Sequence, residues 1–278
     1  MTDVSLNAAT RSGLLDLQRN AQARLQTTNR FSTGQRVNRV TDDPVRFSQS
    51  QALLNRVSDL FSLKDGTGQA LSAVETALNG TEAIESLTQQ LRGLATSARG
   101  ATTEQRQIIA EQFDVVRSQI DALAGDVSYN GISLLDNPAG TLRQQVGDVS
   151  QGEITVAGQA SDSSTLGISS ATASLNNFAS DADINAALAG IDSAVTTLRS
   201  SASQFGSSVA ALTVAENFNS SLSATLQAGN DKLVNADLNE EAAKLLSVGI
   251  RDQLGQASLR ITQQSDTAIS QLLSGVTG

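Results

Sequence analysis

The sequence predicts a mainly α-helical fold: a long antiparallel helical rod or coiled-coil bundle with a small β-hairpin region, whose terminal helices pair as a coiled coil. Three observations support this prediction. Aromatic residues make up only 3% of the chain, too few for the aromatic-anchored core of an ordinary compact domain. Apolar residues recur at alternating spacings of three and four on both sides of the middle. Turn residues and strand-like alternation gather in the middle itself.

The first and last helices are expected over about residues 5–32 and 238–273. Ala, Thr, Ser and Gln occupy many of their core positions, so packing scarcely offsets a backbone entropy cost of roughly 1–2 kcal/mol per residue. We therefore expect these two helices to need a partner. The predicted seam of the first helix is Leu14, Leu17, Ala21, Leu25 and Thr28. The predicted seam of the last helix is Leu245, Ile250, Leu254, Ala257, Ile261, Ala268 and Leu272.

Three further helices are expected between them, with recognisable ends. In "RFSTGQRVNRVTDDP", Gly34 suits the end of the first helix, while Asp43 and Pro44 suit the start of the next, with Asp42 adding charge at its positive end. That helix is expected to run to about residue 99. Thr102 with Gln105 fits a capping box for the third helix. The returning helix begins near residue 182, and Asp237 with Glu240 fits a cap for the last.

The middle of the chain reads as turns and short strands. Asn-Gly in "SYNGISLLD" predicts a tight turn, and "LRQQVGDVSQGEITVAG" predicts a β-hairpin at about 142–157. The Ser-, Ala- and Thr-rich stretch at about 158–180 is expected to be a short surface loop with little to bury. We accordingly expect a terminal-helix domain of residues 1–40 and 235–278, and a helical rod domain of residues 41–234.

The composition excludes most classes of chemistry. Without cysteine or histidine the chain has no thiol nucleophile, imidazole base or Cys/His zinc site, and it lacks the G-x-x-x-x-G-K-[ST] phosphate loop. The adjacent carboxylates Asp42–Asp43 and Glu240–Glu241 stand at expected helix starts, and we attribute them to capping. The sequence therefore predicts no catalytic residue, no cofactor, no metal and no enzyme.

Charge and hydropathy bear on the partners. Residues 1–64 carry nine Lys/Arg against five Asp/Glu, whereas the rest carries ten against twenty-three, for a net charge of −9. Arginine and aromatic residues do not interleave in the basic segment, so we expect no nucleic-acid partner. A neighbouring acidic subunit is the alternative. No run approaches the roughly 20 apolar residues of a membrane span, and the N-terminus lacks the pattern of a cleavable secretory signal.

Several motifs, in order, resemble bacterial flagellins. "STGQRVNRVTDD" resembles the family's Ser-Thr-Gly-x-Arg-(Ile/Val)-Asn run before an acidic pair, and "SYNGISLLD" with the following hairpin resembles the segment after its N-terminal helices. "NADLNEEAAKLLSVGIRDQLGQASLRITQQSDTAISQLL" resembles its C-terminal helix. The resemblance covers nearly the whole length. It implies a minimal flagellin without large outer domains.

The resemblance implies a structural subunit that self-assembles into the flagellar filament for swimming motility, secreted through type III export and extracellular. Its implied partners are copies of itself, an export chaperone, and the hook-associated junction and cap proteins. A hook–filament junction protein of the same superfamily is the alternative. A soluble coiled-coil adaptor is a third possibility.

Three sets of site residues are predicted. Subunit contacts are expected at Arg30, Arg36, Asn38, Arg39, Asp42, Asp43, Leu245, Ile250, Leu254, Ile261 and Leu272. The resemblance places Gln90, Arg92 and Leu94 in the segment that a vertebrate innate immune receptor reads in many flagellins, with Gln90 where the family commonly has arginine. Candidate O-glycan acceptors are Ser161, Ser163, Ser164, Thr165, Ser169, Ser170, Thr172 and Ser174.

Overall fold

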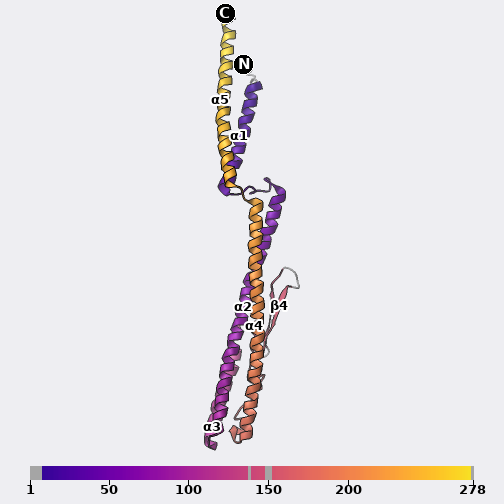
Figure 1. Ribbon diagram of the computed structural model, residues 1–278, viewed down its shortest axis with the longest axis vertical. Coiled ribbons are helices and arrows are strands. Elements are labelled where there is room, and N and C mark those ends of the chain that lie inside the picture. The colour runs from indigo at the N-terminus through magenta and orange to yellow at the C-terminus, as the bar shows by residue number, and fades with distance from the viewer. Residues whose placement is uncertain (1–7, 137–138, 148–151, 277–278) are drawn as a thin grey trace. The chain divides into compact units, whose positions relative to one another are not determined.

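The computed structural model describes residues 8–136, 139–147 and 152–276, which are mostly helical (Figure 1). The helices are α1 (Ala8–Thr33), α2 (Pro44–Ala98), α3 (Thr103–Asp126), α4 (Asp181–Val234) and α5 (Leu238–Val276), with a short 3-10 helix at Asn176–Phe178. The strands are β1 (Ser128–Tyr129), β2 (Ile132–Ser133), β3 (Thr141–Gln145) and β4 (Glu153–Ala157). The predicted mainly α fold with a small β region is confirmed. Within these ranges, no helix combines the length and hydrophobicity that crossing a bilayer requires.

The chain packs as two compact units. The terminal unit consists of Met1–Val57 and Thr225–Gly278, and the central unit consists of Ser58–Ala224. The boundaries between the units fall within α2 and α4, so each of these two long helices contributes residues to both units.

The core of the central unit is built mainly from alanine and branched aliphatic side chains of α2, α3 and α4. The rings of Phe113 and Phe178 meet edge to face with their centroids 5.5 Å apart, a favoured aromatic geometry. The predicted capping box is present, since the side chain of Thr102 accepts from the backbone of Gln105 and the reverse bond also forms. Other fully buried members are Ile84, Leu91, Ile120, Leu135, Ile184, Ile191, Leu198, Phe205 and Leu212.

Two hairpins follow α3. β1 and β2 pair across Asn130 and Gly131, whose φ angles are +50° and +79°. A two-residue hairpin of this kind requires positive φ at both central positions, and Asn-Gly adopts it most readily, so the predicted tight turn is confirmed. β3 and β4 pair antiparallel, with Thr141 opposite Ala157 and Gln145 opposite Glu153.

The segment after β4 differs from the sequence prediction. It packs into the core of the central unit, where Leu166, Ile168, Ala171, Leu175 and Phe178 are all buried. The expectation of a loop with little to bury was wrong. The segment is rich in Ser and Thr, but its five apolar residues are spaced so that all of them reach the core.

A row of charged residues on α3 fastens this segment. The Asp114 carboxylate accepts hydrogen bonds from the backbone N–H groups of Ala171 (2.8 Å) and Thr172 (3.0 Å) and from the Ser170 hydroxyl (2.8 Å). Arg117 Nε donates to the Ile168 carbonyl at 3.0 Å. One turn further on, Asp121 accepts from the Ser163 N–H at 2.7 Å. The row thus satisfies backbone groups that the irregular segment cannot pair within itself.

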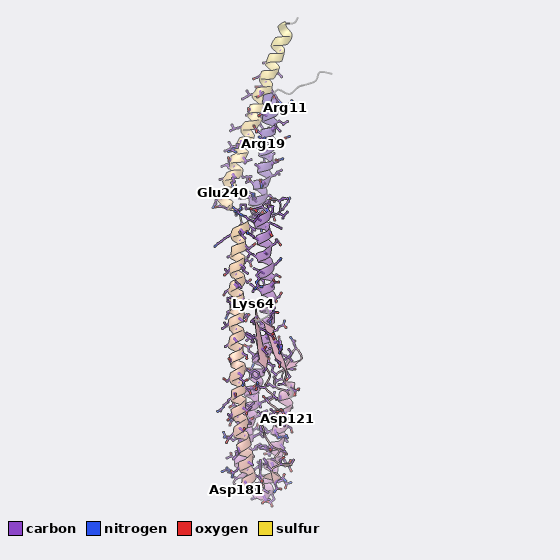
Figure 2. All side chains as sticks on the ribbon, turned by 90° about the vertical axis from the view of Figure 1, so that its right-hand side faces the viewer. Arg11, Arg19, Lys64, Asp121, Asp181 and Glu240 are labelled. Carbon is purple, nitrogen blue, oxygen red and sulfur yellow. The ribbon has the colours of Figure 1, made fainter. Side chains whose placement is uncertain are left out.

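Arg106 closes the end of the same segment. Residues Asn176–Phe178 all have positive φ, and the Arg106 guanidinium donates to the Phe178 carbonyl at 3.2 Å. It also donates to the Arg99 carbonyl near the end of α2 and to Asp181 in the first turn of α4, at 2.8 Å (Asp181 is labelled in Figure 2). One side chain therefore ties α2, α3 and α4 to a strained turn.

The connections of the terminal unit are held by local caps and by one bridge. Gly34, with φ +68°, ends α1, and Asp43 caps α2 by accepting from the Arg46 N–H at 3.0 Å, as predicted. The α1–α2 loop then pairs with the α4–α5 loop: the Arg36 N–H donates to the Val234 carbonyl at 2.7 Å. The Ala236 N–H donates to the Gly34 carbonyl at 2.9 Å.

Asp42 has a different role from the predicted one. Its carboxylate accepts from the backbone N–H groups of Arg39 (2.9 Å) and Asn38 (3.1 Å) and so closes the α1–α2 loop. These two hydrogen bonds lower the pKa of Asp42 below 3.8, and the bond from the Arg39 N–H has the larger effect. The sequence identified the acidic residue but attributed it to the helix dipole.

Asp114→Asn tests the fastening of the 159–180 segment. Burial raises the pKa of Asp114, but the hydrogen bonds from Thr172, Ala171 and Ser170 outweigh it and leave the pKa below 3.8. Because the folded pKa is lowered, the carboxylate contributes stability above about pH 4 and loses it as pH falls through the folded pKa. Asp114→Asn should lower the free energy of unfolding at pH 7 by about 1–3 kcal/mol in urea denaturation.

The difference between Asp114→Asn and the unchanged chain should shrink as pH falls from 4 towards 2. The exposed neighbour on α3 supplies the control: Glu111→Gln should change stability by less than about 0.5 kcal/mol. A difference that stayed constant down to pH 2 would contradict the role assigned to the ionised carboxylate.

Candidate interaction surface

The terminal unit is dominated by α1 and α5, which lie side by side and antiparallel (Figure 1). Gly13 and Leu17 near the start of α1 meet Leu259 and Gly255, while Arg30 in its last turn meets Glu241 in the first turn of α5. The predicted pairing of the terminal helices is therefore confirmed.

Two reciprocal glycine–leucine contacts set the distance between these helices. A Cβ atom at Gly13 would stand 2.9 Å from Leu259 Cδ2, and a Cβ atom at Gly255 would stand 2.9 Å from Leu17 Cδ2. Each leucine thus fills the space that a glycine of the other helix leaves open. The sequence prediction missed both glycines, although their spacing from the leucines was the available signal.

Charged side chains flank this narrow seam. Arg30 Nη1 lies 3.7 Å from Glu241 Oε1, and Glu241 is almost completely buried. Lys244 lies 2.7 Å from Glu240 and 3.4 Å from Glu241, and the hydrogen bond to Glu240 raises the pKa of Lys244 above 10.5. Figure 2 shows Glu240 at the start of α5 and Arg11 and Arg19 along α1.

Most large aliphatic side chains of the predicted α5 seam are exposed, although Leu259 of the same helix packs on α1. Leu254 and Ile261 are 65% and 64% exposed, Ile250 is 49% exposed, and only Leu245 of the predicted seam here is half-buried. The side chain of Leu272 lies outside the described residues. The apolar spacing located a stripe correctly, but the face that packs on α1 is the one with the glycine. We call the exposed residues Leu246, Ile250, Leu254 and Ile261 the outer stripe of α5.

α1 has the same character. Leu25 is 72% exposed, and Leu14 and Leu15 are about half exposed, whereas Leu17 turns towards Gly255. Large exposed aliphatic groups on both helices are unusual for a soluble monomer and mark a surface for another protein. The arrangement defines a mainly helical protein whose terminal helices carry an exposed apolar face.

The predicted arginine contacts prove to differ from one another. Arg30 pairs with Glu241, and Arg36 Nη2 donates to the Leu233 carbonyl at 3.4 Å, at the end of α4. Both therefore have partners within this chain. Asn38 and Arg39 are exposed in the loop that Asp42 closes.

The predicted receptor segment borders a shallow groove on the central unit. Gln90 and Leu94 of α2 line it, together with Ile108 and Val115 of α3, both more than half exposed. Arg92 points elsewhere and pairs with Asp192 of α4. The sequence prediction missed the contribution of α3 because Ile108 and Val115 lie beside its core seam.

The candidate O-glycan acceptors fall into three groups. Ser161 and Ser163 are each only 1% exposed, so their inclusion was wrong: the packing of the segment encloses them. The hydroxyls of Ser170 and Thr172 donate to Asp114. Four other candidates are exposed: Ser164, Thr165, Ser169 and Ser174.

Comparison with known proteins identifies the family. Residues 4–140 match the family model "Bacterial flagellin N-terminal helical region". A flagellin of Brucella melitensis is 25% identical over 99% of this chain and 100% of that protein. Flagellin FljK of Caulobacter vibrioides is 32% identical over 54% of this chain and 53% of its own length. Flagellin D of Rhizobium meliloti is 34% identical over 35% of this chain and 25% of its own.

A solved Bacillus cereus flagellin covers 55% of this chain and 88% of its own, with 24% identity and a TM-score of 0.48. Taking the family model with the full-length Brucella relative, this chain belongs to the bacterial flagellin family.

Gly255→Leu should separate α1 from α5, because the added side chain occupies the place of Leu17. Leucine is also a strong helix former, so α5 itself should keep its helicity. The backbone amides of α1 should exchange at least tenfold faster with deuterium. Gly249→Leu on the same helix, where an added Cβ meets nothing within 4 Å, is the matched control and should leave that exchange unchanged. Equal effects of the two changes would contradict the close glycine–leucine contact.

Arg36→Ala and Arg39→Ala should differ in stability. Arg36 hydrogen-bonds a carbonyl at the end of α4, so its removal should lower the free energy of unfolding by about 0.5–1.5 kcal/mol. Arg39 is exposed, and its removal should cost less than about 0.5 kcal/mol. Urea denaturation of the two variants measures this difference, and equal losses would show that Arg36 owes its role to something other than the Leu233 contact.

Proposed function

We propose that this chain is the structural subunit of a bacterial flagellar filament and assembles with copies of itself into a helical polymer used for swimming. The observation that carries the proposal is the pair of terminal helices with large aliphatic side chains on their outer faces. Membership of the flagellin family supports the identity of the partner as a second copy. A contact between unlike surfaces that does not close into a ring generates an open helical filament.

Composition agrees with a subunit that is exported and then assembled. The chain has no cysteine, so no disulfide can hinder its unfolding before passage through a narrow channel. The seam between α1 and α5 contains glycine and small residues, so little apolar area resists separation of the helices. We infer that the protein reaches the extracellular part of the flagellum by type III export.

Two further classes of partner follow from the same surface. The outer stripe of α5 is exposed until assembly, and an export chaperone that covers it would prevent premature polymerisation. The first and last subunits of a filament lack one neighbour each. Hook-associated junction proteins and a cap protein would supply the missing contacts at the two ends.

The exposed loop residues Asn38 and Arg39 remain candidates for contacts between subunits, in addition to the outer stripe of α5. Arg39 carries a positive charge in the basic N-terminal part of a chain whose remainder is strongly acidic. Exposed ion pairs contribute only about 0–1 kcal/mol each, so we assign such contacts to filament shape more than to affinity. The exposed residues of the 159–180 segment remain candidates for O-glycosylation.

Leu254→Ser with Ile261→Ser should prevent polymerisation without unfolding the subunit. Burying two such aliphatic side chains at a contact is worth roughly 1.5–3 kcal/mol each, and every 1.4 kcal/mol changes an equilibrium constant about tenfold. The critical concentration for polymerisation, measured by sedimentation and electron microscopy after seeding, should therefore rise at least tenfold.

Gln256→Ser with Gln263→Ser, two exposed polar positions on the same helix, should leave the critical concentration within about twofold. Circular dichroism should show equal helix content in both double variants. Normal filaments from the Leu254/Ile261 variant would overturn the assignment of the outer stripe, and a chain that never polymerises when seeded would overturn the proposed function.

A further inference from the structure

The Arg30–Glu241 ion pair lies where little water can reach it, so charged groups there lose hydration free energy. The side chain of Glu241 is 4% exposed and that of Arg30 is 25% exposed, and the nearest atoms are 3.7 Å apart. Lys244 reaches Glu241 Oε1 at 3.4 Å. Among the described residues, Arg30 Nε and Glu241 Oε2 are buried without a hydrogen-bond partner.

A buried ion pair with this geometry is expected to contribute little to the stability of the folded chain. Removing two charges from water costs several kcal/mol per ion, and a long, incompletely hydrogen-bonded contact returns only part of it. Apolar side chains of similar size would pack the same space at less cost. A benefit other than stability is therefore needed to explain why both charges stand in the seam.

Apart from this ion pair, the main features of the seam that distinguish one register from another are its two glycine–leucine contacts. Gly13, Leu17, Gly255 and Leu259 make two small–large contacts. The other half-buried positions include small or polar residues such as Ala23 and Thr262, together with Leu245 and Val248. A displacement of one helix along the other by seven residues turns the same faces towards each other, but it places Val248 or Thr262 instead of Gly255 opposite Leu17. The same displacement moves Arg30 and Glu241 about 10.5 Å apart along the helix axis.

We propose that the Arg30–Glu241 pair is a register lock: it selects one antiparallel alignment of α1 and α5, because any other alignment takes Arg30 away from the buried Glu241 and leaves that carboxylate with Lys244 of its own helix. A single buried polar residue fixes register in the same way in coiled coils. The second interhelical pair, Arg24–Asp252 at 3.8 Å, is unsuited to this task because Arg24 is 60% exposed and its charge stays hydrated after a slip.

Disulfide trapping in the full-length, unassembled chain measures the register directly. The chain has no native cysteine, so each two-cysteine variant forms one possible intramolecular link. Leu17→Cys with Gly255→Cys reports the observed register, because a Cβ atom at 255 lies 3.5 Å from Leu17 Cγ. Leu17→Cys with Val248→Cys or with Thr262→Cys reports a slip of seven residues in either direction. Equilibration in a glutathione redox buffer gives the relative population of each link.

With Arg30 and Glu241 intact, the 17–255 link should exceed each slipped link at least tenfold. In the Arg30→Leu/Glu241→Leu background the slipped links should rise to within threefold of the 17–255 link, at unchanged helix content. Arg30→Lys, which keeps the charge, should retain the tenfold preference. The matched control, Arg24→Leu/Asp252→Leu, should retain it as well.

Retention of the tenfold preference in the Arg30→Leu/Glu241→Leu background would overturn the register lock. Loss of all three links there would overturn it too, because the ion pair would then be needed for association of the helices and not for their alignment. The readout needs no polymer, so a failure of the proposed filament function leaves the test intact.

Discussion

Close packing of helices through alanine and glycine is the constraint on which the rest of this structure depends. Ala70, Ala73, Ala77, Ala95 and Ala98 line the α2 side of the central core, and glycines receive the leucines in the terminal pair. Small side chains let the axes of two helices approach closely, but each residue then buries little apolar area. Because α2 and α4 are each more than 50 residues long, the small apolar area buried in each turn is summed over many turns.

The irregular 159–180 segment is held by its buried apolar residues and, in addition, by charged side chains that bind its backbone. Asp114, Arg117 and Asp121 stand on one side of α3 and bind the backbone of the 159–180 segment, while Arg106 binds the turn with positive φ. Each of these bonds involves a charged group and is stronger than a neutral hydrogen bond. The charges act on backbone groups, so they fix the path of the chain irrespective of which side chains the segment carries.

Local chemistry explains why helix ends and turns were predictable from the sequence. Gly34, Thr102, Asp237 and Asn130–Gly131 act on backbone groups within four residues, and all four features are in the structure. Which face of a helix packs against a neighbouring helix was not predictable in this way. The period of the apolar residues located the stripe of α5, yet packing on α1 is decided by whether a glycine can admit a leucine from another helix. The burial of the 159–180 segment likewise depends on Asp114, far away in sequence.

The same reasoning explains why the outer stripe of α5 is richer in large aliphatic residues than the seam. If the large side chains packed α1 on α5, the pair would be stable alone and its free surface would be polar. With the large groups outside, Leu246, Ile250, Leu254 and Ile261 stay exposed in the single chain. A partner that covers these side chains would therefore add to the stability that the α1–α5 contacts supply within the chain. For the filament subunit proposed above, such a coupling between binding and stability would favour polymerisation at the growing end over association of free subunits.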